Sequence, residues 1–401
     1  MKSYNRIFIR FCIQQASYWS YVAAMMGYMT SYMLSKGISS AALGYILAAN
    51  LLTTFLGSIF WGRRIDAEQN NRKYYIMTNI FALILGSCMF QNAGNMFRMM
   101  LLYPLYGFMV GHTATNLDSW VMLSFPEMKD AVGRTRFFAT FFYAVTMLVC
   151  GQLISKIGYS VMPVCMVLFL GISITAALLQ NNTTEKKPMQ NKCSRRGIRL
   201  QDITELLWSR DYLLLVAAVF LTGLCIAPLN NMKPVILSSV GADVSYVGYD
   251  SFIGCMIQAP FLLFSGYFRR FSKRSRLLAG VLMPLLYALF TSTAMSANMV
   301  IAGGICNNIS FGLLFPTMRE MTEESVNPAL RNTAHSIVDV SYGSFSGMIA
   351  LLYSSAVIDS AGFRVMGGIC VIIQIAAILV VLFGMSSQRT EVLRTHQNMR
   401  L

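Results

Sequence analysis

The residues of this chain best suited to chemistry begin with a carboxylate and a guanidinium placed 18 positions apart. Asp118 stands in the stretch Thr-Asn-Leu-Asp-Ser-Trp at the end of one apolar run, and Arg136 ends the stretch Gly-Arg-Thr-Arg that opens the next. Two antiparallel helices joined by a short loop would bring the two side chains face to face. An acceptor-only carboxylate beside a donor-only guanidinium can satisfy the hydroxyl groups of a polar solute. The alternative is a structural ion pair that braces the two helices.

Two further carboxylates stand inside apolar runs. Asp339 follows His335 by four positions and shares a helical stripe with Tyr342 and Ser346. Burial disfavours the charged form of a carboxylate, which suits it to bind a proton on one side of a membrane and release it on the other. Asp250 lies near the end of another run. We expect Asp339 and Asp250 to couple protons. The alternatives are a neighbouring cation that pairs with Asp339 and external water around Asp250.

Neutral polar side chains also recur inside the apolar runs. Gln14, Tyr18 and Tyr21 share one helical face by i, i+4 and i+7 spacing. Any one such group can form an interhelical hydrogen bond, worth about 0.6 kcal/mol. Together they predict a cavity for a hydroxylated solute. Its candidate lining residues, besides Asp118 and Arg136, are Gln14, Tyr18, Asn116, Asn230 and Asn307.

The elements that hold these residues must be membrane helices. Of the 401 residues, 55% are hydrophobic and 12% are charged, about half the charged share of a soluble globular chain. A helix needs roughly 20 apolar residues to cross a bilayer. Twelve runs qualify, near residues 9–33, 41–62, 74–91, 97–123, 136–157, 161–179, 212–240, 245–268, 277–295, 298–318, 331–354 and 363–385. We predict an all-α membrane protein with twelve transmembrane helices in two six-helix bundles.

Charge placement predicts the topology. A polar linker at 181–210 separates an N-terminal bundle, 1–180, from a C-terminal bundle with a tail, 211–401, and the linker's end, LQDITELLWS, is a predicted surface helix. With both termini inside, 27 of the 32 Lys and Arg fall in inner segments and five, Lys233 among them, in outer segments. This bias favours a plasma-membrane protein with both termini in the cytoplasm. It also accounts for the net charge of +15 without nucleic acid.

Sequence matches between the two halves share one offset of 204 residues. Leu43-Gly-Tyr recurs as Val247-Gly-Tyr, Gly62 recurs as Gly266, and Gly158-Tyr-Ser-Val-Met recurs as Gly362-Phe-Arg-Val-Met. Three matches in one register indicate an internal duplication. Two related halves are the architecture of a transporter whose site lies between them near the middle of the membrane.

The turn expected after the second helix carries a family signature. It reads Gly62-Arg-Arg-Ile-Asp66-Ala-Glu-Gln-Asn-Asn-Arg72-Lys73, which resembles the loop between helices two and three of the major facilitator superfamily. The resemblance implies that Asp66 caps a neighbouring helix and that Gly62, Asp66, Arg72 and Lys73 form a cytoplasmic gating loop. The alternative is a solvated basic turn. In the second half Arg270 stands where the Asp would, so a second latch is not expected.

The stretch around Asp118 is similar to the oligosaccharide–proton symporter branch of that superfamily, the lactose permease group. That branch carries an acid on helix four, a Gly-Arg-x-Arg stretch on helix five and an aromatic residue two turns later, where this chain has Tyr143. The resemblance implies that Asp118 and Arg136 bind sugar hydroxyls and that Tyr143 stacks on the sugar ring. The branch's acid on helix eight corresponds to Cys255, and its helix-ten His and Glu are missing from Cys306-Asn-Asn-Ile-Ser. Its proton-coupling residues therefore do not carry over.

These features predict a secondary transporter that moves a small polar solute, a sugar or glycoside, by alternating access with proton coupling. The alternatives are a nucleoside permease of the same fold, an exporter of amphipathic drugs or metabolites, and a transport-inactive membrane sensor. The sequence has no P-loop and its three His are scattered, so we expect no enzyme activity, cofactor or metal site. The nine Cys include no CxxC pair and predict buried thiols. We expect a monomer in membrane lipid that binds no nucleic acid.

Overall fold

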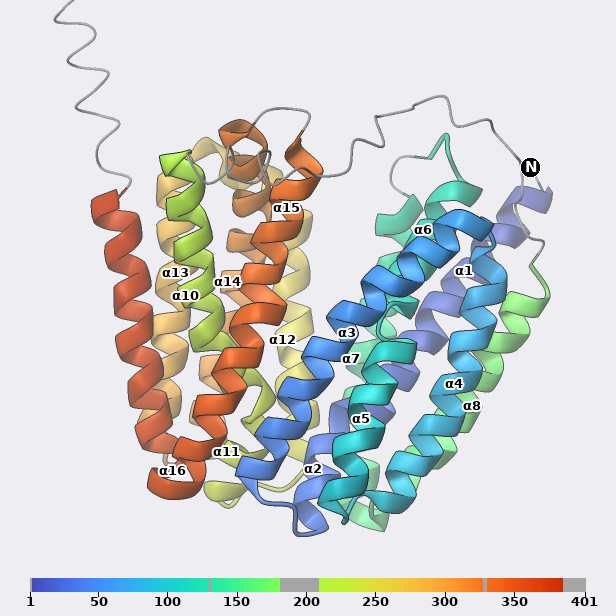
Figure 1. Ribbon diagram of the computed structural model, residues 1–401, viewed down its shortest axis with the longest axis horizontal. Helices are drawn as coiled ribbons and strands as arrows, with labels where there is room; N and C mark the ends of the chain where they lie inside the picture. Colours follow the sequence, from blue (N-terminus) through green and yellow to red (C-terminus); the bar gives the residue numbers. More distant parts are fainter. Residues whose placement is uncertain (1, 129–130, 181–208, 327–329, 385–401) are drawn as a thin grey trace, which may run out of the picture. The chain divides into compact units, whose positions relative to one another are not determined.

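The computed structural model describes residues 2–128, 131–180, 209–326 and 330–384, and every regular element in these ranges is helical (Figure 1). This confirms the predicted all-α class. Contacts between Cα atoms divide the chain into two compact units. The first lies within Met1–Pro188 and Met232–Cys255, and the second within Met189–Asn231 and Met256–Leu401.

The first unit contains the six segments predicted in the N-terminal half. In chain order they are α1 (Lys2–Tyr21), the π-helical turn η1 (Val22–Met26), α2 (Gly27–Ser35), α3 (Ser40–Glu68), α4 (Asn71–Asn92), α5 (Met96–Val110), α6 (Thr113–Ser124), α7 (Ala131–Ile157) and α8 (Val161–Leu178). α1, η1 and α2 form one continuous segment. α5 and α6 form another, which is interrupted at Gly111 and His112.

The rest of the described chain contains the six segments predicted in the second half. They are formed by α10 (Arg210–Asn231), α11 (Lys233–Ser239), α12 (Ser245–Leu263), the 3-10 turn η2 (Ser265–Arg270), α13 (Lys273–Ser292), α14 (Ala297–Ser325), α15 (Arg331–Asp339), the π-helical turn η4 (Val340–Phe345), α16 (Ser346–Leu379) and the π-helical turn η5 (Val380–Gly384). α10 and α11 make the seventh segment. Gly362, with φ of 84°, divides α16 between the eleventh and twelfth.

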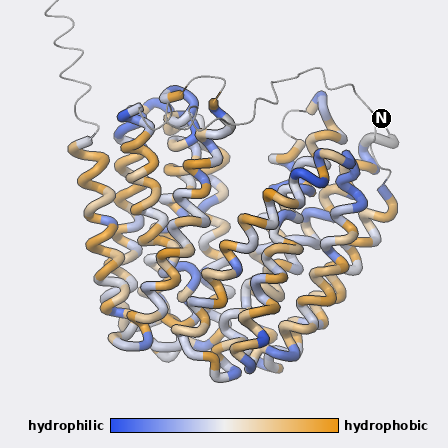
Figure 2. The backbone as a smooth tube through the Cα atoms, in the orientation of Figure 1, coloured by the Kyte–Doolittle hydropathy of each residue, from blue (hydrophilic) through white to orange (hydrophobic). Residues whose placement is uncertain are grey.

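Helix length and hydropathy agree with a membrane protein. Eight helices in the described residues are long and apolar enough to cross a bilayer. Other predicted spans are divided into shorter helices: α5 has 15 residues and α6 has 12. Figure 2 shows hydrophobic residues along the bodies of the helices and hydrophilic residues at many of the turns. The described chain thus contains twelve helical segments, six in each half, as the sequence predicted.

Backbone geometry supports the predicted duplication. Among the described residues, four glycines have a positive φ, and they form two pairs that are each 204 positions apart. Gly37 and Gly241 have φ of 87° and 74°, and Gly158 and Gly362 both have φ of 84°. Glycine adopts this left-handed conformation without the steric cost that a Cβ atom brings. Both halves therefore reverse direction at the same two points of the repeat.

Helix packing in the first unit depends on small residues. α3 lies against α5, where a Cβ atom on Gly57 would clash with the carbonyl group of Phe108. α4 lies between α5 and α8, and α1 packs against both α7 and α8.

In the second unit α13 packs on α14 and α16, and α10 packs on α16. A buried cluster around Tyr212, Leu277 and Leu314 forms the apolar core of that unit.

The segment Met232–Cys255 packs with the first unit although it belongs to the second half of the sequence. A Cβ atom on Gly248 of α12 would lie 2.5 Å from the carbonyl oxygen of Met147 on α7. Tyr28 of α2 donates its hydroxyl hydrogen to that same oxygen. The bundle boundary predicted at residue 211 therefore differs from the compact units in this segment. Most of the predicted linker, including its surface helix, and the C-terminal tail lie outside the described residues.

Candidate functional site

Asp118 and Arg136 form the ion pair that their spacing predicted. The Nε atom of Arg136, on α7, lies 3.1 Å and 3.0 Å from the two carboxylate oxygens of Asp118, on α6, and Nη2 donates a further hydrogen bond. The Asp118 side chain is 20% exposed and the Arg136 side chain 43% exposed. The pair is therefore partly accessible, and its role in solute binding stays a prediction.

Two side chains of a third helix, α1, contact this ion pair. Gln15 of α1 is fully buried, and its Nε2 atom donates to Asp118 Oδ1 at 2.9 Å. One turn along α1, the guanidinium carbon of Arg136 lies 5.6 Å from the ring centre of Trp19. Trp19 in turn meets Tyr143 edge to face, with the ring centres 6.2 Å apart. Asp118 and Arg136 thus meet as predicted, and Tyr143 adjoins them through Trp19. Gln15 and Trp19, which lie beside the predicted polar face of helix one, complete the group.

Three other predicted lining residues are buried inside the unit. Gln14 is fully buried and accepts a hydrogen bond from Gln180 at 3.1 Å. Asn116 is 4% exposed and exchanges two hydrogen bonds with Asn71. Tyr18 is 5% exposed among aromatic rings. The geometry of these three residues is that of helix packing, so their role in solute binding stays a prediction.

The second unit contains a separate cavity of about 280 Å³. Its lining is rich in side-chain amides and comprises Gly223, Ile226, Ala227, Asn230, Asn231, Gln258, Asn307, Asn308, Phe311, Tyr342 and Gly343. The two predicted residues meet there: Asn307 Nδ2 donates to Asn230 Oδ1 at 3.4 Å, and Tyr287 donates to the same oxygen at 3.1 Å. None of the described residues that line this cavity carries a carboxylate or a cation, so it suits an uncharged polar group.

Asp339 pairs with a cation, the alternative considered for it. Arg319 Nη2 on α14 lies 2.6 Å from Asp339 Oδ2 on α15, and the side chains are 36% and 41% exposed. His335, one turn before Asp339, lies 3.7 Å from Glu323. The charges of this pair are placed in the opposite order to those of Asp118 and Arg136. Here the earlier helix carries the Arg and the later helix carries the Asp.

Asp250 also pairs with a cation, and this pair is buried. Lys233 Nζ lies 2.5 Å from Asp250 Oδ2, and the side chains are 12% and 6% exposed. Lys233 was counted among the outer cations, within the predicted helix 212–240, and it is the first residue of α11 and packs within the first unit. External water around Asp250 was the other expectation, and its burial contradicts that.

The gating loop was predicted with the wrong boundaries. α3 continues to Glu68 and α4 begins at Asn71, so Gly62 and Asp66 lie on a helix and not in a loop. The turn between the helices is stabilised, because Lys73 pairs with Glu68 across it at 2.8 Å. Arg72 donates to the carbonyl oxygen of Leu178 at 2.7 Å, which ties α4 to the end of α8.

The second half has a similar contact, in which the arginine lies 202 and not 204 positions further along the chain. Arg274 donates to the carbonyl oxygen of Leu382 at 2.7 Å, and Leu382 is 204 positions after Leu178. A cation at a helix C-terminus is favourable because the carbonyl groups there carry partial negative charge. Both halves therefore contain an arginine that donates a hydrogen bond to a backbone carbonyl oxygen near the end of another helix.

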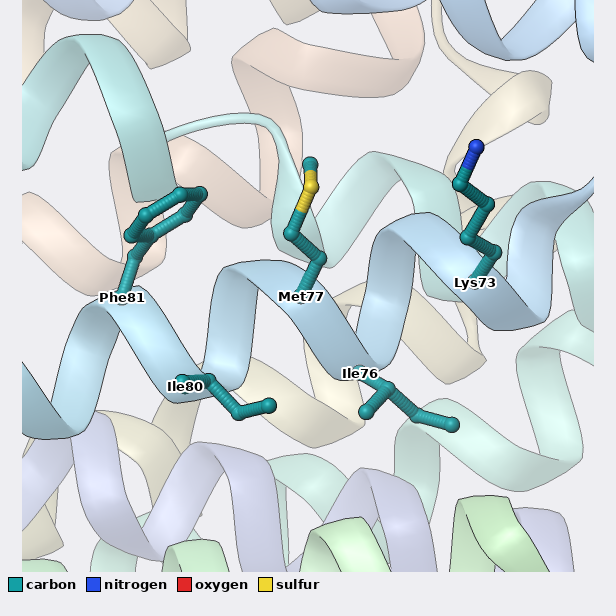
Figure 3. Close-up of a pocket in the computed structure, with 5 residues that line it drawn as sticks. All are labelled: Lys73, Ile76, Met77, Ile80 and Phe81. Atoms are coloured by element: carbon teal, nitrogen blue, oxygen red, sulfur yellow. The ribbon is translucent and has the colours of Figure 1, made fainter.

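The surface of α4 beyond this turn carries a shallow groove of about 370 Å³ (Figure 3). Lys73, Met77 and Phe81 point to one side of the helix, and Ile76 and Ile80 complete the lining. Among these described lining residues, Lys73 alone has a polar side chain, and it lies at one end of the groove. Such a face suits lipid and offers no set of hydrogen-bonding groups for a polar solute.

Comparison with known proteins agrees with this architecture. The model of the MFS_1 like family matches residues 16–366. The maltose permease of Geobacillus stearothermophilus is 24% identical over 225 residues, which cover 56% of this chain and 55% of that protein, so the chain matches about half the length of this relative.

Solved structures share the fold at lower identity. A single-residue mutant of the nucleoside transporter NupG has a TM-score of 0.80 at 14% identity, covering 95% of this chain and 99% of that one. A D-xylose–proton symporter has a TM-score of 0.66 at 13% identity, covering 96% and 97%. The family match spans most of the twelve segments, and the chain therefore belongs to the MFS_1 like family of the major facilitator superfamily.

Proposed function

We propose that this protein is a secondary active transporter that moves a small polar solute across the plasma membrane by alternating access, with both termini in the cytoplasm. Its membership of the major facilitator superfamily supports the transport activity. The distribution of Lys and Arg supports the orientation. The protein acts as a monomer surrounded by lipid.

The solute is a sugar or glycoside, and the observation that carries this choice is the group formed by Asp118, Arg136, Trp19 and Tyr143. Sugar hydroxyls donate and accept hydrogen bonds, and the carboxylate and guanidinium supply both partners. The rings of Trp19 and Tyr143 meet beside them and offer apolar faces for the C–H face of a sugar ring. The similarity to a maltose permease supports the same class.

The amide cavity favours a neutral solute and also supports a second candidate, a nucleoside. The cavity is lined by planar side-chain amides, each with a hydrogen-bond donor and an acceptor, from Asn230, Asn307 and Gln258. Such amides can pair with the edge of a nucleobase as well as with sugar hydroxyls. The fold similarity to a nucleoside transporter is compatible with this candidate. Protons are the coupling ion, with Asp339 and Asp250 as the candidate carriers.

Uptake by the purified full-length protein in liposomes tests the proposal. Labelled maltose, xylose and uridine are offered with an inward proton gradient, with and without an uncoupler. We expect one of them to accumulate, the uncoupler to prevent accumulation, and Asp118→Asn to reduce uptake. Glu324→Gln, which removes one partner of the exposed Lys273–Glu324 pair, is the matched control and should transport normally.

The alternatives predict other results in the same assay. A transport-inactive sensor would bind one of these solutes without moving it. An exporter of amphipathic compounds would accumulate none of the three and would protect a pump-deficient host against such compounds. Uptake that is unaffected by Asp118→Asn would refute the proposed binding group.

A further inference from the structure

A groove of about 540 Å³ lies between α1 and α8 of the first unit, apart from the solute-binding group. Its lining comes from Arg10 and Ile13 of α1 and from one side of α8 between Val167 and Leu179. Five of the lining side chains, all of them aliphatic, are 41–59% exposed. At Gly171 a Cβ atom would meet no atom within 4 Å, so the missing side chain leaves room in the groove. The groove is therefore an open, apolar surface that an acyl chain can cover.

The length of the groove matches one leaflet of a bilayer. Val167 and Leu179 are 12 residues apart along α8, and a rise of 1.5 Å per residue places them about 18 Å apart. The hydrocarbon core of a bilayer is about 30 Å thick, so one leaflet contributes about 15 Å. The apolar span of α8 ends at Leu178, and Arg10 contacts the next residue. The Arg10 end of the groove therefore lies at the level of the lipid headgroups, and the rest lies among the acyl chains.

Two arginines meet the C-terminal end of α8 without a carboxylate partner. Arg10 of α1 donates to the carbonyl oxygen of Leu179, and Arg72 of α4 donates to that of Leu178 at 2.7 Å. Among the described residues, neither guanidinium forms an ion pair. Arg6, one turn before Arg10 on α1, adds a third, exposed cation. A guanidinium has five N–H donors, so Arg10 keeps donors for an anion after its contact with Leu179.

The groove on α4 provides a contrast (Figure 3). It also has a cation at one end, Lys73, but Glu68 pairs with Lys73 at 2.8 Å. The positive charge of that groove is thus compensated within the protein. Both grooves can hold an acyl chain, and of the two the one between α1 and α8 has the uncompensated charge that favours an anionic headgroup.

We propose that the groove between α1 and α8 binds one anionic phospholipid of the cytoplasmic leaflet, with the phosphate on Arg10 and an acyl chain along α8. Guanidinium and phosphate form short, charge-assisted hydrogen bonds that are frequently bidentate. With both termini in the cytoplasm, Arg10 lies in the leaflet whose anionic lipids attract basic groups. A zwitterionic lipid brings its own cation and leaves the charge of the arginines uncompensated. The bound lipid links α1 to α8 at the end where Arg72 ties α4, and so stabilises the packing of three helices.

Native mass spectrometry of the full-length protein in detergent tests the inference. The probes are phosphatidylglycerol and phosphatidylcholine with the same palmitoyl and oleoyl chains, and we expect phosphatidylglycerol to bind the more tightly. Arg10→Gln should weaken its binding about tenfold, because hydrogen bonds to a charged group are lost. Lys73→Gln removes a cation that Glu68 compensates, so this matched control should bind as the wild type does. Absence of bound phosphatidylglycerol, equal binding of the two lipids, or an equal loss in the two variants overturns the inference.

Gly171→Leu provides a second test, because it leaves Arg10 in place and fills the open space of the groove, and it decides the matter if Arg10→Gln does not fold. A ligand that binds the folded protein raises its thermal unfolding temperature. Phosphatidylglycerol should therefore raise this temperature in the wild type and have a much smaller effect on Gly171→Leu. Inorganic phosphate at the same concentration should raise it in neither. Equal stabilisation of the wild type and Gly171→Leu by the lipid, or stabilisation of the wild type by inorganic phosphate alone, overturns the inference.

Discussion

Replacing Asp118 with asparagine separates solute binding from structural support at the α6–α7 pair. The two side chains are 20% and 43% exposed, and exposed ion pairs contribute about 0–1 kcal/mol to stability. The asparagine would keep an oxygen that can accept from Gln15, so the thermal unfolding temperature should change little. A hydrogen bond from a solute hydroxyl to a charged group is worth about 1.5–3 kcal/mol. Its loss should weaken solute binding roughly 10- to 150-fold, because about 1.4 kcal/mol corresponds to a factor of ten.

The assay measures both quantities on one preparation. Binding or uptake of the solute found in the liposome screen gives the affinity, and thermal unfolding in detergent gives the stability, with Glu324→Gln as the control. A large fall in unfolding temperature with unchanged affinity would show that the ion pair only braces the two helices. That result would refute the assignment of Asp118 to the solute.

Three further substitutions test the packing and the site. Gly248→Ala places a Cβ atom 2.5 Å from the carbonyl oxygen of Met147 and should cost about 1–3 kcal/mol of stability in thermal unfolding, whereas Gly266→Ala, which meets no atom within 4 Å, should not. Gly362→Ala, at φ of 84° and ψ of 167°, a conformation that essentially only glycine adopts, should cost about 1–3 kcal/mol in the same measurement. Trp19→Ala removes the face beside Arg136 and should weaken solute binding about tenfold, while Trp19→Phe retains most of it; equal effects of the two changes would contradict a stacking role.

The sequence predicted those features that depend on local order. Apolar runs of the right length indicated the helical class, and a short loop between antiparallel helices was enough to expect that Asp118 would meet Arg136. The end of α3 was missed because hydropathy falls at the polar residues after Gly62. The helix nevertheless continues through them, since helix formation does not require apolar side chains.

Features that depend on distant packing were not predictable in this way. Asn116 and Asn307 are both amides within apolar runs, but one exchanges hydrogen bonds with Asn71 in a buried interface and the other lines a cavity. Hydropathy and spacing treat them alike. The burial of Lys233 likewise depends on α11 packing with α2, far away in the sequence. Charge counts along the chain place such a lysine on the outer side, but they contain no information about its partner.

The three acid–base pairs, Asp118 with Arg136, Lys233 with Asp250 and Arg319 with Asp339, have a consequence for energetics in a living membrane. Each pair carries no net charge and lies within one compact unit. Moving one uncompensated elementary charge across a membrane potential of about 100 mV changes its free energy by about 2.3 kcal/mol. Reorienting these neutral pairs moves no such charge. With a neutral solute, the voltage dependence of the transport cycle should therefore come from the steps that carry the proton. The return of the empty protein should be nearly independent of voltage.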